Sequence, residues 1–376
     1  MKTNVLQSNL RNGLVIIERI TAKSVALPVL GNVLVSCDKN FICLSATDLE
    51  IAAHFWVLSK TEKEGKITLP AKLFLQLVSS IAEEKVELEV KNNNLIVKNN
   101  ICTSQLRGQN PEEFPVIPEI KKDYTFELNI GSFCQGLTQT VDVASTSSHK
   151  PELTGVYCML GKKMLILAAT DSFRLAEKTL FFADETSVPE GGLSFIIPVK
   201  IVRELINVFG GTQGRIKLFL SQNQIAFEYV SPEVSHPQIQ LLSRLIEGEY
   251  PSYKDIIPQK HDAQFITPKA DFINQIKAAS YFTQKTNEIS LHFIPGKGLE
   301  ITSQNPDSGE YSALIKGKCD GEEMNIDFNW KFILDGLVNI KSDEIALYAQ
   351  KNGGPATLCP VGDTSYIYVV MPIRAG

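Results

Sequence analysis

Long apolar runs are missing from this sequence. No stretch approaches the roughly 18 uninterrupted apolar residues that a membrane helix needs. The first residues also lack the basic-then-apolar layout of a secretory signal. The seven cysteines are scattered and include no Cys-x-x-Cys pair, which favours reduced thiols over disulfides or a metal site. We therefore expect a cytoplasmic protein with no membrane partner and no bound metal.

Catalytic motifs are scarce as well. There is no Gly-x-x-x-x-Gly-Lys-Ser/Thr loop, and the glycines within 210–214 follow a predicted helix, so they indicate a helix end and not a phosphate cradle. The five histidines show no His-x-x-x-His spacing, and no Gly-x-Ser-x-Gly elbow is present. Asp48 and Asp171 recur in Ala-Thr-Asp segments, where we expect them to stabilise turns. The sequence thus predicts neither an enzyme nor a cofactor.

A threefold internal repeat is what the sequence contains instead. Three segments share an extended run, a turn, a lysine and an amphipathic helix, followed by a period-two strand, a turn and a second strand. The three lysines, spaced 128 and 131 residues apart, are Lys72, Lys200 and Lys331. A further helix is expected to open each repeat. This period predicts three tandem α+β domains at 1–122, 123–261 and 262–376, each with two helices on one face of an antiparallel sheet.

Basic residues gather on the predicted helices, at 7–20, 71–81, 132–143, 200–209, 269–280 and 331–340. The whole chain has 37 Lys plus Arg against 42 Asp plus Glu, which gives no global reason to seek nucleic acid. The helix windows nevertheless hold five acidic residues and eight basic ones: Arg11, Arg19, Lys72, Lys200, Arg203, Lys269, Lys277 and Lys331. If all helices share one concave side, these cations neutralise phosphates without reading bases. Solvated helix faces remain an open alternative on charge alone.

A series of motifs, in order along the whole chain, resembles the bacterial sliding clamp family, the beta subunit of the replicative DNA polymerase III. The motifs are LPVLGNVLV (27–35), LSATDLEI (44–51), LPAKLF (69–74), EFPVIP (113–118), LTGVY (153–157), AATDSFRLA (168–176), IIPVK (196–200), EYPSY (249–253) and YVVMPIR (368–374). The resemblance implies a head-to-tail homodimer closing into a ring of six clamp domains around double-stranded DNA, bound without sequence preference. It also implies that the protein is a non-catalytic subunit that gives the polymerase processivity, and that it lies in the cytoplasm in association with the nucleoid.

The resemblance further implies partners and residues. The partners are the DNA polymerase III catalytic subunit, the clamp loader complex, and other polymerases and repair proteins with clamp-binding peptides. A peptide pocket between the second and third domains would use Leu153, Thr170, Arg174, Leu175, Pro251, Ile256, Asn329, Phe332, Val369, Val370, Met371, Pro372, Ile373 and Arg374. Rim loops would add DNA contacts from Lys23, His149 and Lys150. The ring seam would join the edge from Ile101 to Leu106 with Lys277, Tyr281 and Phe282.

Two other function classes stay open. A peptide-binding hub that does not encircle DNA is favoured by Ser24 and Asp255, which stand where basic residues are common in the family, and by the modest basic excess. Phe173, where many members carry a polar residue, leaves the peptide preference open. A metabolic enzyme on a repeated α+β scaffold would need a site that the sequence does not display.

Overall fold

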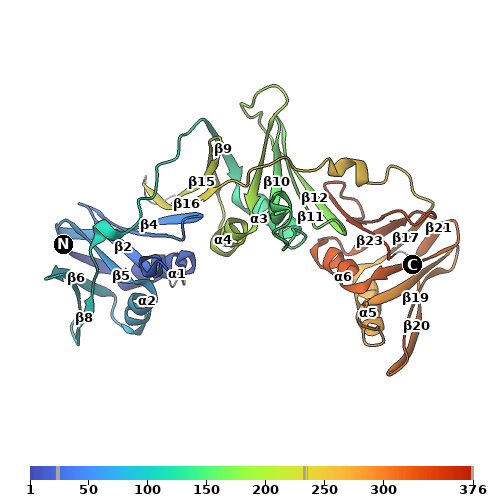
Figure 1. Cartoon of the computed structure of the whole chain (residues 1–376), viewed down its shortest axis with the longest axis horizontal. Helices are drawn as coiled ribbons and strands as arrows, with labels where there is room; N and C mark the ends of the chain where they lie inside the picture. Colours follow the sequence, from blue (N-terminus) through green and yellow to red (C-terminus); the bar gives the residue numbers. More distant parts are fainter. Residues whose placement is uncertain (23–25, 232–233, 235, 374–376) are drawn as a thin grey trace. The chain divides into compact units, whose positions relative to one another are not determined.

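The computed structural model describes all 376 residues except 23–25, 232–233, 235 and 374–376. Figure 1 labels the helices and strands of the chain. Its contacts divide the chain into two compact units, Met1–Gly131 with Arg203–Leu245, and Ser132–Val202 with Ile246–Gly376. Each unit contains a large sheet whose strands come from two successive repeats. The compact units therefore follow the sheets, and the predicted domain boundaries at 122 and 261 stay a prediction.

The first unit is built on one twelve-stranded antiparallel sheet, with main path β8-β7-β6-β1-β4-β16-β15-β14-β9 and with β3, β2 and β5 branching from β4. Its strands are β1 (Lys2–Leu6), β2 (Asn32–Cys37), β3 (Phe41–Thr47), β4 (Ile51–Lys63), β5 (Gly65–Pro70), β6 (Lys85–Lys91), β7 (Asn94–Lys98), β8 (Thr103–Arg107), β9 (Tyr124–Asn129), β14 (Arg215–Leu220), β15 (Gln224–Val230) and β16 (Pro237–Arg244). Helices α1 (Gln7–Ile20) and α2 (Ala71–Ser80) pack side by side in this unit. Their apolar stripes, including Leu10, Leu14 and Phe74, are fully buried, as the periodicity predicts.

The second unit contains a nine-stranded antiparallel sheet, ordered β13-β10-β11-β12-β25-β24-β23-β17-β21, and a four-stranded one, ordered β20-β19-β18-β22. The strands are β10 (Gly155–Leu160), β11 (Met164–Thr170), β12 (Arg174–Phe181), β13 (Leu193–Pro198), β17 (Ala263–Pro268), β18 (Glu288–Ile294), β19 (Gly298–Asn305), β20 (Gly309–Ile315), β21 (Lys318–Gly321), β22 (Met324–Asn329), β23 (Glu344–Ala349), β24 (Ala356–Pro360) and β25 (Tyr366–Val370). Helices α5 (Lys269–Ser280) and α6 (Trp330–Asn339) bury Phe272, Ile276 and Leu337 in its main core.

Helices α3 (Ile130–Val141) and α4 (Val199–Phe209) complete the set, and each has residues in both units. All six predicted helix windows are confirmed, with every boundary within two residues. The expectation that a helix opens each repeat is wrong, because β1, β9 and β17 precede α1, α3 and α5. These strands are five or six residues long, and their alternation of apolar and polar residues is too short to stand out from a loop.

Candidate functional site: a partner pocket and basic helices

The turn between β11 and β12 is organised by two side chains. The Thr170 hydroxyl donates to the Arg174 carbonyl at 2.7 Å and accepts from the Ser172 amide at 3.2 Å. One oxygen of the Asp171 carboxylate accepts from the amides of Phe173 and Arg174, both at 3.0 Å. Asp171 is therefore a turn-stabilising residue, as predicted, and the turn presents Phe173 with 61% of its surface exposed.

Arg174 is held from several sides within the second unit. Its Nε donates to Asp171 at 3.0 Å, its two terminal nitrogens bond the Asp335 carboxylate and the Asp142 carbonyl, and only 13% of its side chain is exposed. Its guanidinium also lies 4.8 Å from the ring centre of Phe332. These partners fix the Arg174 side chain, and the two carboxylates balance its charge. The planar face of its guanidinium therefore lies beside Phe332.

Helix α6 supplies Phe332 and is itself fixed against β25. Gly336 allows this approach, since a Cβ there would lie 2.5 Å from Tyr368 Cδ1. The Tyr368 hydroxyl donates to the Phe332 carbonyl at 2.7 Å. The Asn329 side chain caps the helix by accepting from the Lys331 amide at 3.0 Å. Phe332 and Phe173 stack with ring centres 6.3 Å apart, so two aromatic rings line one side of the predicted pocket.

Residues 371–373, which follow β25, are held by backbone hydrogen bonds. Strand β25 pairs with β12, setting Val370 opposite Arg174 and Val369 opposite Leu175. Beyond the strand, the Met371 amide donates to the Phe173 carbonyl and the Ile373 amide to the Asp327 carbonyl, both at 2.8 Å. Met371, Pro372 and Ile373 are held half-exposed. The predicted contact Arg374 lies outside the described residues.

An aromatic cluster beside these elements was missed by sequence reasoning. Tyr157 and Tyr250 stack at 5.0 Å, and Tyr253 packs edge-on against both. The Tyr253 hydroxyl donates to Glu177 at 2.5 Å. Burial, and to a smaller extent the Glu177 carboxylate, raise the pKa of Tyr253, and burial also raises the pKa of Tyr250. The EYPSY motif marked the segment, but nothing in the sequence indicated that Tyr157 and Glu177 meet it.

The predicted pocket residues fall into two groups. Leu153, Leu175 and Val369 are buried together in one small apolar cluster, and Val370 is buried in the main core. These buried residues form the floor of the predicted pocket and are not accessible to a peptide. The accessible members, from three segments of the second unit, are Pro251, Ile256, Phe332, Met371, Pro372 and Ile373. The structure thus brings most predicted residues onto adjoining segments of one unit, as a hot-spot peptide site requires.

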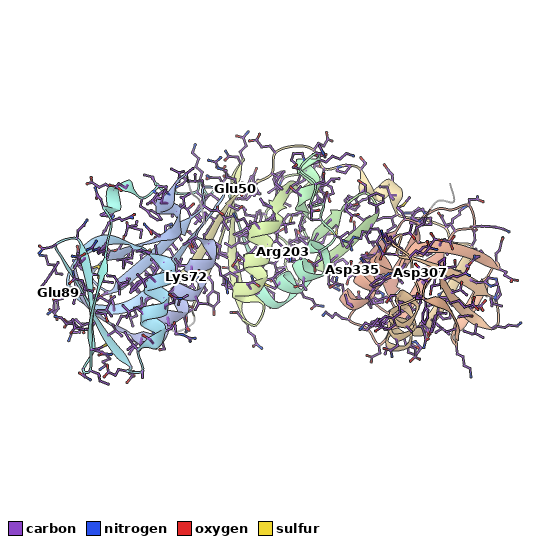
Figure 2. All side chains as sticks on the ribbon, turned by 60° about the horizontal axis from the view of Figure 1, so that its bottom comes forward. Glu50, Lys72, Glu89, Arg203, Asp307 and Asp335 are labelled. Atoms are coloured by element: carbon purple, nitrogen blue, oxygen red, sulfur yellow. The ribbon has the colours of Figure 1, made fainter. Side chains whose placement is uncertain are left out.

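The predicted DNA-binding cations differ in availability. Arg11, Lys72, Arg203, Lys277 and Lys331 are exposed, as are the rim residues His149 and Lys150; Lys72 on α2 and Arg203 on α4 are labelled in Figure 2. Lys200 is exposed too, although partial burial of its ammonium lowers its pKa. Lys23 lies outside the described residues.

Arg19 and Lys269 make side-chain contacts within their own units. Arg19 donates to Glu204 at 3.1 Å. Lys269 donates to the Ile340 carbonyl at the end of α6, at 2.8 Å, where a cation also favours the helix dipole. The structure therefore gives Lys269 a structural contact that its sequence position did not reveal.

The predicted seam residues lie at two sheet margins. Strand β8 is an edge of the twelve-stranded sheet; its residue Leu106 is buried, whereas Ile101, two residues before the strand, is 84% exposed. Tyr281, at the end of α5, is 78% exposed, while Phe282 stacks on Tyr311 at 6.0 Å. Strand β20 is an edge of the four-stranded sheet. Both margins thus combine an unpaired edge strand with one exposed apolar side chain.

Other site classes find little support in the part of the chain that the structure describes. There, no three His, Cys, Asp or Glu side chains come together as a metal site would require. None of the described helices combines the length and apolarity needed to cross a bilayer. All seven cysteines are free thiols, as their spacing predicts.

Comparison with known proteins places this fold in a class. Three family models match in order: the DNA polymerase III beta subunit N-terminal domain over residues 1–118, its central domain over 127–252 and its C-terminal domain over 254–374. The solved sliding clamp of Bacillus subtilis superposes with a TM-score of 0.92 at 24% identity, and the DNA polymerase III beta subunit of Thermotoga maritima with 0.90 at 23%, each over 100% of both chains. The fold is therefore the three-repeat DNA-clamp fold.

Curated relatives agree with the family models. The beta sliding clamp of Synechocystis is 28% identical over 395 residues, which cover 100% of this chain and 99% of that protein. The beta sliding clamp of Bacillus subtilis is 24% identical over 387 residues and 100% of both. The chain belongs to the DNA polymerase III beta subunit family. It is a sliding clamp of that polymerase and a non-catalytic subunit, which confirms the resemblance seen in the motifs.

Proposed function

We propose that this chain encircles double-stranded DNA as a head-to-tail homodimer and tethers the DNA polymerase III catalytic subunit, the clamp loader and repair proteins through one peptide pocket. The proposal carries the family's function to individual residues of this chain. The observation that supports it most is the anchored C-terminal segment, which holds Met371, Pro372 and Ile373 half-exposed beside Phe332.

The peptide pocket is supported by its mixture of fixed and accessible apolar groups. Buried Leu153, Leu175 and Val369 provide a packed floor, while Phe173 and Phe332 add two stacked rings at its side. A preformed apolar site of this kind reduces the ordering cost of binding a short peptide. Since Arg174 is neutralised by Asp171 and Asp335, we expect the peptide to bind mainly through apolar side chains.

DNA binding is supported by exposed cations on helices of all three repeats: Arg11, Lys72, Arg203, Lys277 and Lys331. Such side chains contact phosphates, which every DNA sequence offers, so moving one step along the duplex exchanges equivalent contacts. The homodimer is supported by the exposed Ile101 beside edge strand β8 and the exposed Tyr281 at the end of α5, because unpaired edges favour a covering partner. Cytoplasmic, nucleoid-associated localisation follows from the same proposal.

The pocket is tested by fluorescence polarisation with a labelled clamp-binding peptide from the polymerase III catalytic subunit of the same organism. We expect micromolar binding to the full chain, and its loss in a version ending at Val370, which removes Met371 and Ile373 with their backbone anchors. A matched version ending at Ile373 retains those anchors and should bind within about threefold of the full chain. A folded full chain that does not bind the peptide would contradict the proposed pocket.

A further inference from the structure

A second turn in the molecule repeats the geometry of the pocket turn. Between β3 and β4, the Thr47 hydroxyl donates to the Ile51 carbonyl at 2.8 Å, and Asp48 accepts from the Glu50 and Ile51 amides at 3.0 and 2.8 Å. Leu49 has a φ of 79°, the same left-handed value as Ser172 in the pocket turn. The internal repeat therefore preserves the turn down to its hydrogen bonds.

The strand beside this turn is also equivalent. Strand β16 pairs with β4 so that Ser243 lies opposite Ile51 and Leu242 opposite Ala52, as Val370 lies opposite Arg174 and Val369 opposite Leu175. The Arg244 amide donates to the Glu50 carbonyl at 3.1 Å, just as the Met371 amide donates to Phe173. Arg244 therefore occupies the structural position of Met371.

A cavity of about 220 Å³ lies at this second turn, wholly within the first unit. Its apolar lining includes Leu49, Val116, Ile225 and Leu242. Leu49 is 48% exposed and Val116 91% exposed. Val116 belongs to the EFPVIP segment, whose counterpart in the next repeat carries the pocket residue Ile256. Two exposed aliphatic side chains at one cavity offer an anchoring point for an apolar side chain.

Charge distinguishes this cavity from the first pocket. The exposed Arg244 lines it, and none of the carboxylates in the described residues forms an ion pair with its guanidinium. Glu50, labelled in Figure 2, also lines it but already has an interaction partner. In the first pocket, Arg174 is neutralised by Asp171 and Asp335. At this cavity the Arg244 guanidinium has no such ion pair among the described residues, so it favours a ligand with a negative charge.

We propose that the cavity at Leu49, Val116, Leu242 and Arg244 is a second peptide-binding site, which takes a short extended peptide with an acidic residue next to aliphatic ones. The aliphatic side chain enters the cavity and the carboxylate forms a charge-assisted pair with Arg244. This site goes beyond the proposed function, and its existence depends neither on DNA encirclement nor on the first pocket.

The test is fluorescence polarisation of a fluorescein-labelled Ser-Leu-Asp-Leu-Ser peptide, with Ser-Leu-Asn-Leu-Ser as its neutral control. The full-length protein carries Met371→Asp throughout, which disables the first pocket. Arg244→Glu removes the proposed cation, Val116→Asp places a charge at the apolar rim, and Lys217→Glu is a charge control at an exposed lysine on β14 of the same sheet. We expect the Met371→Asp protein to bind the acidic peptide, with at least tenfold weakening by Arg244→Glu or Val116→Asp and no change with Lys217→Glu.

Three results would overturn the second site. One is the absence of binding to the Met371→Asp protein when the parent protein binds, which would confine peptides to the first pocket. Another is equal affinity for the aspartate and asparagine peptides, which would remove the role of Arg244. The third is a change of oligomeric mass in Val116→Asp by light scattering, which would make this surface a contact between copies of the chain. Failure of the first pocket is read separately, from the Val370 truncation.

Discussion

Replacing Asp171 with alanine should loosen the pocket turn more than replacing it with asparagine. Asp171 accepts two backbone hydrogen bonds, both at 3.0 Å, and a third from Arg174 Nε at 3.0 Å. The two side chains of this ion pair are only 13% and 18% exposed, so solvent screens the pair weakly. Asparagine keeps an oxygen that accepts from the backbone amides but loses the charge that pairs with Arg174.

The magnitude follows from the number and kind of bonds lost. Two backbone bonds to a carboxylate and one partly buried ion pair together contribute about 3 kcal/mol to the local stability of the turn at Asp171, of which the ion pair supplies about 1.5 kcal/mol. In hydrogen exchange, these values correspond to roughly hundredfold faster opening in Asp171→Ala and roughly tenfold in Asp171→Asn.

The assay is hydrogen–deuterium exchange read in peptides covering 170–175, in both variants and the parent protein. Asp171→Asn is the matched control, because its amide oxygen still accepts from the backbone while its charge is gone, so its effect should be intermediate. Unchanged exchange in Asp171→Asn would refute the reasoning, since it would mean that the ion pair to Arg174 contributes nothing.

Three further outcomes are expected. Tyr281→Asp places a charge at the proposed seam and should convert the dimer to a 41.6 kDa monomer in light scattering; an unchanged dimer would exclude that seam. Lys72→Glu should reduce the slope of log DNA affinity against log salt by about two, because the homodimer carries two copies of Lys72 and each loses one phosphate contact, whereas Lys269→Met should leave the slope unchanged. Burial lowers the pKa of His54 to about 4 from an ordinary 6.5, so the unfolded state binds its proton first as the pH falls. The free energy of unfolding of the protein should therefore fall by about 3 kcal/mol between pH 6.5 and 4. His54→Gln should flatten that part of the pH profile of stability measured by urea unfolding.

The repeat made much of the fold predictable. The spacing of Lys72, Lys200 and Lys331 located three equivalent helices, and apolar periodicity set their limits within two residues. The period-two strand predicted after the first of these helices is β6, in which alternate residues Val86 and Leu88 are buried. Local patterns of this kind are visible in sequence because they depend on neighbours along the chain.

Long-range pairing was not predictable in the same way. The joining of β4 to β16 and of β12 to β25 links strands that are far apart in sequence, and no local pattern specifies such partners. The result is that sheets continue across repeat boundaries, which the predicted three-way division did not anticipate.

Within the candidate site, sequence motifs located the segments but not their chemistry. The motif AATDSFRLA predicted Arg174 as a pocket residue, whereas its bonds to Asp335 and to the Asp142 carbonyl depend on packing between distant elements. For the same reason the contact between Tyr253 and Glu177 was missed. The helix lysines could not be distinguished by sequence as DNA-binding or structural. Only the structure shows that Lys269 donates to the carbonyl of Ile340 at the end of α6.

Enclosure of DNA by two copies of this chain can be measured as retention of the protein on circular DNA. The protein is loaded by the clamp loader of the same organism onto nicked circular DNA, and the bound fraction is measured before and after the circle is cut once. Topological tethering predicts stable retention on the circle in high salt and rapid loss on linearisation, with Tyr281→Asp never retained. Equal retention on circular and linear DNA, or none on either while peptide binding is intact, would contradict encirclement and favour a hub that binds partners only.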